Sequence, residues 1–224
     1  MDTIDRIRQE LNHLANEKSK KIYFKQNIQE EVLGVNMGPL RKIARAIKAN
    51  NPLAWELWAS NVYELRIVAT AVFEADLLTE DQLLKLIQTT ETTYLIDEIA
   101  FTLVAKRNDL QALMDRWFEH DDDRVYRSAW NLAIVLNKAK QLTMDQRQDL
   151  LDIVEKDLFN EEAKTQYTMN RLLCEIGIQE DALTHRCVQI GESLGLYKDV
   201  KVAKGCVSPY APAWIEAGRR NRKD

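Results

Sequence analysis

Three ionic side chains lie near the starts of three apolar segments at almost equal spacing. Asp97 follows Arg66 by 31 residues, and Arg127 follows Asp97 by 30. Asp97 flanks an apolar stripe, where a carboxylate is costly unless it is paired or opens onto a groove. Two interpretations stay open. An ion pair between Asp97 and Arg127 could fix the packing of neighbouring helices. Alternatively, the carboxylate could stabilise a developing cation while the arginine holds a phosphate.

The elements that must position these groups are helices. Apolar residues recur at three-to-four spacing along almost the whole chain, and no segment shows the sustained alternation of a strand. Prolines favoured in a first helical turn occur at Pro39, Pro52 and Pro212. Polar residues that could serve as N-caps are Thr79, Asn108, Asp123, Thr143 and Asn160.

The helices alternate in character. Segments such as "TEDQLLKLIQTT" are amphipathic, whereas "YELRIVATAVFEA" and "YLIDEIAFTLVA" are apolar on more of their surface, as inner helices are. A helix pair every roughly 30–45 residues is typical of HEAT-type repeats. We therefore expect an all-α, ARM/HEAT-like α-α superhelix of antiparallel helix pairs, with a plain helical bundle as the alternative. Without a linker, residues 1–224 should form one domain, in which 204–224 are a C-terminal cap and basic tail.

Composition limits the class of protein. The 224 residues carry a net charge of −4, but residues 198–224 hold seven Lys/Arg against three Asp/Glu. An acidic body argues against non-specific coating of nucleic acid, although a local basic groove is compatible with it. The cysteines Cys174, Cys187 and Cys206 show no zinc-site spacing and fit free thiols in a reducing cytosol. With no apolar signal core, we expect a soluble cytoplasmic protein. We also expect no metal and no cofactor.

Other candidate groups have structural explanations. The tryptophans are expected in the core or at interfaces, and "HDDDR" should cap a helix instead of holding a metal. In "KGCVSPYAPAWIEAGRRNRK", Pro212 can begin a last helix whose Trp214 and Ile215 cover the end of the last repeat. Cys206 should be a small packed residue, since no histidine base is close in sequence. The basic groups of this stretch are expected to be solvated or to contact phosphates, and the candidates are Lys204, Arg219 and Arg220.

Several segments together resemble a known family. "GVNMGPLRKIARAIK", "ELRIVATAVFE", "YLIDEIAF" and "RVYRSAW" follow one another as in the AlkD-like DNA alkylation repair family, the HEAT-like repeat DNA glycosylases. "MNRLLCEIGI" and "LYKDVKVAKGCVSPYAPAWI" resemble a subgroup ending in GC-x-SP-x-AP-x-WI. The resemblance covers roughly residues 34–215. It rests on the order and spacing of the motifs, since none of them is strong alone.

The resemblance implies a concave, locally basic face that binds double-stranded DNA. Active members excise N3- or N7-alkylated purines without flipping the base into a pocket. In that scheme Asp97 would stabilise the oxocarbenium-like sugar and help to position water, and Arg127 would lie on the DNA backbone. Two family tryptophans that cradle the lesion correspond here to Thr93, with Tyr94 adjacent, and to Asn170. Loss of both should weaken excision.

Three functions follow as hypotheses. The chain could be an alkylpurine DNA glycosylase that acts through Asp97, a non-catalytic protein that binds branched or damaged DNA, or a scaffold for another protein. We favour association with DNA and expect a monomer. The side chains predicted to contact DNA are Arg127, Tyr94, Arg66, Lys204, Arg219 and Arg220.

Overall fold

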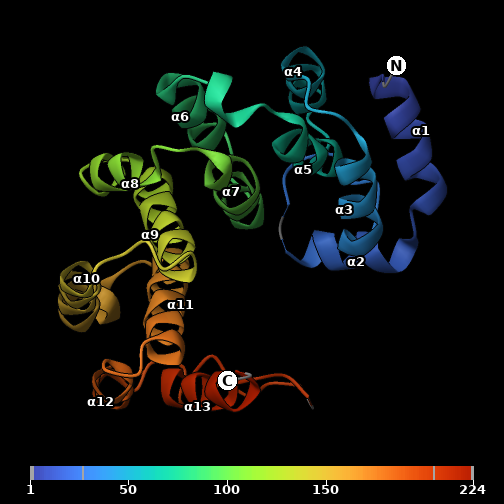
Figure 1. Ribbon diagram of the computed structural model, residues 1–224. Helices are drawn as coiled ribbons and strands as arrows, with labels where there is room; N and C mark the ends of the chain where they lie inside the picture. The colour runs from blue at the N-terminus through green and yellow to red at the C-terminus, as the bar shows by residue number, and fades with distance from the viewer. Residues whose placement is uncertain (1–2, 27, 204, 223–224) are drawn as a thin grey trace. The chain divides into compact units, whose positions relative to one another are not determined.

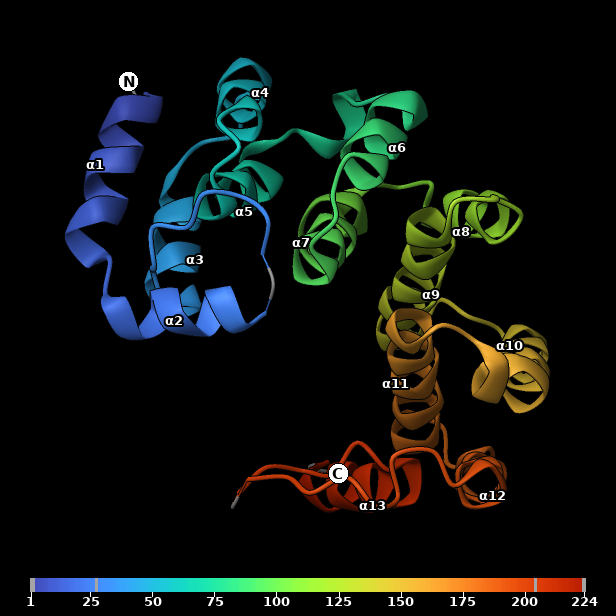
Figure 2. The same ribbon diagram turned by 180° about the vertical axis from the view of Figure 1, so that it is seen from behind.

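The computed structural model describes residues 3–26, 28–203 and 205–222 (Figures 1 and 2). These residues form thirteen α-helices and no strand, apart from one isolated bridge between Glu31 and Val62. The expectation of an all-α chain is confirmed. The chain divides into two compact units, which we call unit 1 (Met1–Leu110) and unit 2 (Gln111–Asp224) and describe separately. The expectation of one domain stays a prediction.

Unit 1 is a set of short helices, some of which begin with a side-chain cap. Its elements are α1 (Ile4–Leu14), α2 (Glu17–Lys25), α3 (Met37–Ala46), α4 (Asn51–Ala59), α5 (Tyr63–Val72), η1 (Ala75–Leu77), α6 (Glu80–Gln88), α7 (Thr93–Glu98), η2 (Ile99–Leu103) and η3 (Val104–Lys106). Thr79 caps α6 through a capping box with Gln82, so that predicted cap is confirmed. Pro52 lies in the first turn of α4, as expected.

The core of unit 1 surrounds α5. This helix packs against α3, α4, α7 and η2, and eight of its ten residues are buried. It is apolar on nearly every side, which identifies it as the inner helix that the sequence predicted. Leu65, Val68 and Val72 are fully buried, and each contributes about 1.5–3 kcal/mol relative to an exposed position.

One buried carboxylate connects α5 to the segment before α3. Glu64 accepts hydrogen bonds from the backbone N–H groups of Leu33 (3.0 Å), Gly34 (2.7 Å) and Val35 (3.1 Å). Gly34 has φ +95°, and an added Cβ would lie 2.7 Å from the carbonyl oxygen of Asn16. Only glycine fits this position without strain. These hydrogen bonds therefore fasten the "GV" segment to the "YELR" segment at the start of α5.

Unit 2 contains longer helices. Its elements are α8 (Leu110–Phe118, beginning at the last residue of unit 1), α9 (Asp123–Lys138), α10 (Met144–Asp157), η4 (Leu158–Asn160), α11 (Ala163–Gln179), α12 (Thr184–Leu194) and α13 (Ala211–Asn221). Figure 1 shows α11 between α9 and the pair α12 and α13, and α11 packs against all three. Helix α13 begins as expected, with Pro212 in its first turn and Ile215 buried.

The N-caps of unit 2 follow the prediction in part. Thr143 caps α10 through a capping box with Gln146, as predicted. The prediction for Asp123 is wrong, because Asp122 caps α9 and accepts from the N–H of Arg124 at 2.9 Å. The prediction for Asn160 is also wrong, since it ends the 3₁₀ turn η4, and α11 starts three residues later with Glu162 at its N-cap. "HDDDR" thus caps a helix, as expected.

Three of the five tryptophans and two of the three cysteines are buried inside the units, whereas Trp55 and Trp214 are partly exposed. Trp58, Trp117 and Trp130 are buried. Cys174 and Cys187 are buried free thiols, whereas Cys206 is exposed, contrary to the expectation of a packed residue. Burial raises the pKa of the Cys187 thiol to about 12 and the pKa of Cys174 well above its ordinary value.

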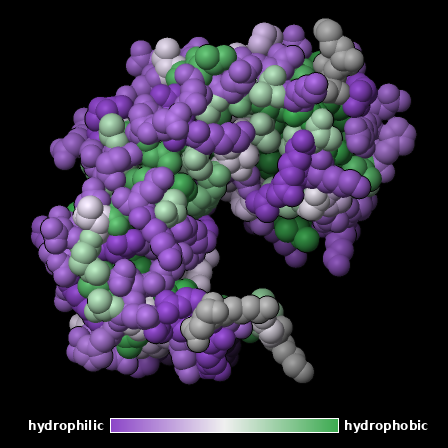
Figure 3. All heavy atoms as spheres, viewed as in Figure 1, coloured by the Kyte–Doolittle hydropathy of each residue, from purple (hydrophilic) through white to green (hydrophobic). Residues whose placement is uncertain are grey.

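The surface is mainly polar. Figure 3 shows one face on which hydrophilic residues predominate, with hydrophobic residues between them. Within the described ranges, no helix has both the length and the apolar character needed to span a bilayer.

Candidate functional site

Asp97 lies in the last turn of α7, next to an irregular stretch of helix. Its neighbours Ile96 and Ile99 are buried, whereas Asp97 is partly exposed. The chain continues as a π-helical turn, η2. Such turns occur mostly as local bulges, frequently at functional sites. The wider turn directly after Asp97 therefore marks this end of α7 as a candidate site within unit 1.

The carboxylate beside Asp97 is held internally. Glu98 is buried, accepts from Nη2 of Arg41 at 2.6 Å, and accepts from the hydroxyl of Thr102 at 2.8 Å. The same Arg41 nitrogen donates to the hydroxyl oxygen of Tyr94 at 3.2 Å. Sequence analysis missed Glu98 and Arg41, although Glu98 is part of the "YLIDEIAF" motif. The contact orders α7 against α3 and leaves about half of the Arg41 side chain exposed.

The hydroxyl of Tyr94 lies close to the carboxylates of Glu98 and Asp97. Burial raises its pKa, and the nearby Glu98 and Asp97 carboxylates raise it further, while Arg41 lowers it. At neutral pH the hydroxyl therefore keeps its proton. Its side chain stays partly exposed, so Tyr94 can present a ring face and a hydroxyl close to Asp97.

Arg66 is used inside unit 1. Its Nε donates to the carbonyl of Trp58 and its Nη1 to Glu30 Oε1, both at 3.1 Å. The guanidinium carbon lies 5.1 Å from the centre of the Trp58 ring, within cation–π range. Glu30 also accepts from Thr92 at 2.9 Å. Only 14% of the Arg66 side chain is exposed, so its internal contacts dominate, and the predicted contact with DNA stays a prediction.

The predicted groups of unit 2 are deeply placed. Arg127 in α9 is 3% exposed. Asn170, whose correspondence to a family tryptophan stays a prediction, is 1% exposed and donates to the carbonyl of Pro209 at 2.9 Å. It therefore fastens the segment before α13 onto α11. Asp97 and Arg127 belong to different units, and the expected pairing between them stays a prediction.

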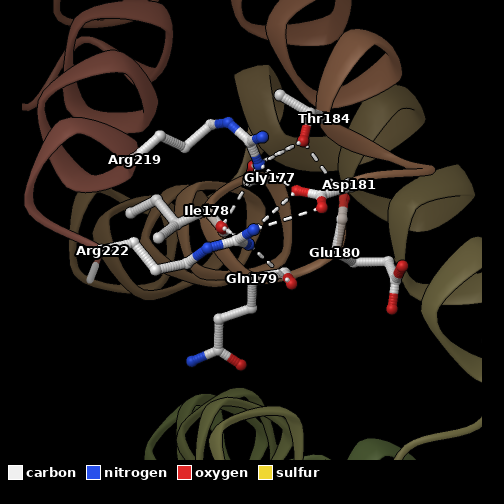
Figure 4. Close-up of polar contacts among 8 residues, drawn as sticks. All are labelled: Gly177, Ile178, Gln179, Glu180, Asp181, Thr184, Arg219 and Arg222. Carbon is white, nitrogen blue, oxygen red and sulfur yellow. Dashed lines mark hydrogen bonds and ion pairs between the residues drawn. The ribbon is translucent and has the colours of Figure 1, made fainter. Parts of the chain in front are cut away.

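The basic end of the chain folds back on α11. In Figure 4 the side chains of Arg219 and Arg222 converge on Asp181 and on the carbonyl groups at the end of α11. Arg219 lies 2.7 Å from Asp181 Oδ1, and Arg222 donates to the two Asp181 oxygens at 3.0 and 3.2 Å. Arg222 also donates to the carbonyl of Ile178 at 2.9 Å. Cations at a helix C-terminus interact favourably with its dipole.

These contacts change the expectation for the tail. The two arginines lower the pKa of Asp181 through hydrogen bonds and charge. Arg219 thus has an intramolecular partner, and Arg220 pairs with Glu216 at 2.6 Å, one helical turn away at an exposed position. Lys204 lies outside the described residues. Contact of Arg219 and Arg220 with phosphate stays a prediction. Arg220 is the better candidate, because its exposed ion pair with Glu216 is weak and a phosphate can replace it.

The described side chains form no cluster of three or more residues suited to holding a metal ion.

Comparison with known proteins decides the family. The sequence pattern of the DNA alkylation repair enzyme family matches residues 7–215. The chain belongs to this family. Two relatives of this chain are uncharacterized proteins of Listeria. The Listeria innocua protein is 26% identical over 227 residues, 98% of each chain, and the Listeria monocytogenes protein is 26% identical over 229 residues, 100% of each chain.

A solved structure has the same fold as this repair-family chain. It is 24% identical, covers 98% of this chain and 93% of its own, and has a TM-score of 0.80. It is described as belonging to a new family related to the HEAT-like repeat DNA glycosylases, with affinity for branched DNA structures. The expected HEAT-like helical-repeat fold is therefore confirmed.

Proposed function

We propose that this member of the DNA alkylation repair enzyme family binds branched or damaged DNA duplexes. Family membership over residues 7–215 supports a DNA substrate, and the similar solved structure comes from proteins with affinity for branched DNA. The observation that carries the choice is the burial of Asn170 and its bond to Pro209. The resemblance implies that the family has a lesion-facing aromatic at this position, whereas Asn170 makes a fold contact, and this supports recognition of DNA over excision.

Phosphate contacts should supply most of the affinity. Each neutralised phosphate releases counterions, and the logarithm of the association constant falls by about 0.9 for each contact and tenfold rise in salt. Arg220 is an exposed group available for such a contact. A branched duplex brings several phosphate backbones together, which favours it over a linear duplex of the same length.

The test is fluorescence anisotropy with a labelled four-way junction and a linear duplex of equal composition, over a salt series. We expect tighter binding of the junction and a steep salt dependence. Arg220→Glu should weaken both complexes and reduce the salt slope. Lys156→Glu is the matched control, since Lys156 is an exposed lysine in α10 with only a 3.9 Å ion pair. Undetectable or salt-independent binding would refute the proposal.

A second candidate function is excision of alkylated purines through Asp97. It is favoured by the partial exposure of this carboxylate beside Tyr94 and directly before η2. A carboxylate placed there would stabilise positive charge that develops on the deoxyribose as the glycosidic bond breaks, and it would orient the attacking water. Release of 7-methylguanine or 3-methyladenine from methylated duplex DNA measures the activity. Release no greater than that of the Asp97→Asn variant would exclude this function.

A further inference from the structure

Unit 1 contains a pocket of about 230 Å³ next to the end of α7. Three tyrosines from α2, α5 and α7 line it: Tyr23, Tyr63 and Tyr94. We call it the tyrosine pocket. The rings of Tyr23 and Tyr63 pack edge to face, with centres 5.1 Å apart and planes at 62°. None of the described lining residues is charged at neutral pH, so the pocket suits a flat, neutral ligand better than a phosphate.

The hydroxyl of Tyr63 is the distinctive polar group of the pocket. The residue is 1% exposed, and no hydrogen bond of its hydroxyl joins it to any part of the chain that the structure describes. The Tyr23 hydroxyl, by contrast, donates to the carbonyl of Val35 at 2.6 Å. Burial raises the pKa of Tyr63, which keeps its hydroxyl a donor at neutral pH. The described buried side-chain atoms that have no hydrogen-bond partner do not include this hydroxyl. Tyr63 lines the pocket, where its hydroxyl can donate to water or to an acceptor on a ligand.

Two amides at the rim add matching groups. Asn36 accepts a hydrogen bond from Ser19 at 2.6 Å through Oδ1, which leaves its amide nitrogen as a donor. The exposed side-chain amide of Gln26 has no hydrogen bond within the described ranges. An amide offers a donor and an acceptor in one plane, as the edge of a nucleobase does. Ring faces together with amide edges are the combination by which proteins hold an unstacked base.

We propose that the tyrosine pocket receives an unpaired nucleobase, with ring stacking on the partly exposed Tyr94 and hydrogen bonds from the Tyr63 hydroxyl and the rim amides. The inference rests on the proposed binding of DNA and names the part of the substrate that this unit reads. The base could come from a DNA strand at a branch or lesion, or it could be a free base or nucleoside. The shared chemistry is the planar heterocycle, and the experiment separates the two sources.

The experiment uses the full chain and a DNA junction that carries 2-aminopurine either at an unpaired branch position or at a paired position. On binding, the fluorescence should change strongly only at the unpaired position. Ile22→Trp fills the pocket from an exposed position of α2 and should abolish this change. Phe24→Trp places the same indole side chain on α2 at an exposed position outside the lining and is the control. Affinity for the junction, measured by anisotropy, should fall by no more than the contribution of one stacked base, roughly five- to hundredfold, and should stay steeply salt-dependent because the phosphate contacts remain.

Tyr63→Phe is a second variant that removes only the hydroxyl. We expect it to reduce the ratio between the affinity for the junction with unpaired 2-aminopurine and the affinity for the junction with paired 2-aminopurine. Loss of a whole stacked base would lower the affinity by roughly five- to hundredfold. Loss of the hydroxyl alone should lower it by an amount in the lower part of that range. Identical responses at the two positions, or an intact response in Ile22→Trp, would overturn the pocket while leaving the binding of DNA in place.

Failure to bind DNA at all would refute the proposed function and leave the pocket to be tested directly. Saturation-transfer NMR with 2-aminopurine riboside alone then decides. A signal that Ile22→Trp removes and Phe24→Trp keeps supports a pocket for a free base. No signal with wild-type protein overturns the proposal.

Discussion

Replacing Glu64 by glutamine tests how far one buried carboxylate stabilises unit 1. In the native protein Oε1 accepts from Gly34 and Val35, and Oε2 accepts from Leu33. Glutamine has the same shape but turns one oxygen into an NH₂ group. If its oxygen keeps the first two bonds, the NH₂ group faces the N–H of Leu33, and two donors oppose one another.

The expected loss follows from these contacts. A hydrogen bond to a charged group contributes about 1.5–3 kcal/mol, whereas removal of a buried charge relieves part of its desolvation cost. We therefore expect Glu64→Gln to lower the free energy of unfolding by about 2 kcal/mol. Glu64→Ala leaves three amides unsatisfied at roughly 1–3 kcal/mol each. That sum approaches the whole stability of a typical domain, about 5–15 kcal/mol, so this variant should be largely unfolded.

Urea unfolding followed by circular dichroism measures the loss. Hydrogen exchange of the amides of Leu33, Gly34 and Val35 locates it, because these three should exchange faster than the helical amides of α5. Glu56→Gln is the matched control, since Glu56 is exposed on α4 and surface changes usually stay within about 0.5 kcal/mol. A Glu64→Gln variant as stable as this control would refute the reasoning.

Three further outcomes can be checked. Arg66→Ala should cost about 3–5 kcal/mol of unfolding free energy, because it leaves the buried Glu30 without its partner; an unchanged urea midpoint together with weaker DNA binding would instead assign Arg66 to phosphate. Under native conditions a thiol reagent should modify Cys206 alone, since the pKa of each of the two buried thiols is raised, and fast reaction of all three would contradict this. The lowered pKa of Asp181 means that its ion pairs stabilise the fold above the ordinary value of 3.8 and cease to do so as the pH falls through the lowered value. Arg222→Gln should move this pKa upward in an NMR titration, and an unmoved pKa would count against the contact.

Local sequence signals predicted the helices well and their ends less well. Thr79 and Thr143 could be predicted because each comes just before a helical segment with acidic residues in its first turn, which is a local pattern. Asp122 could not be told from Asp123, since both are acidic residues just before an apolar stripe. Asn160 lies in a 3₁₀ turn, and the chain's choice between that turn and the start of α11 depends on packing that no local pattern records.

The candidate site was predicted in part for the same reason. The place of Asp97 beside a buried apolar stripe could be predicted from helical periodicity. The partner of Glu98 did not, because Arg41 is 57 residues away in the chain. Likewise Arg66 was assigned to DNA since its partner Glu30, 36 residues earlier, cannot be found by spacing. Contacts across such separations depend on how helices stack, which the periodicity of one helix does not specify.

The π-helical turn η2 also fixes the phase between two parts of one helical path. Deleting one residue from it would restore ordinary α-helical spacing and rotate everything before it by about 100° relative to everything after it, since an α-helix has 3.6 residues per turn. Asp97 would then leave the edge of the apolar stripe, and a different side chain of α7 would take its direction. The direction of the Asp97 side chain thus depends on the number of residues in η2 as well as on their types.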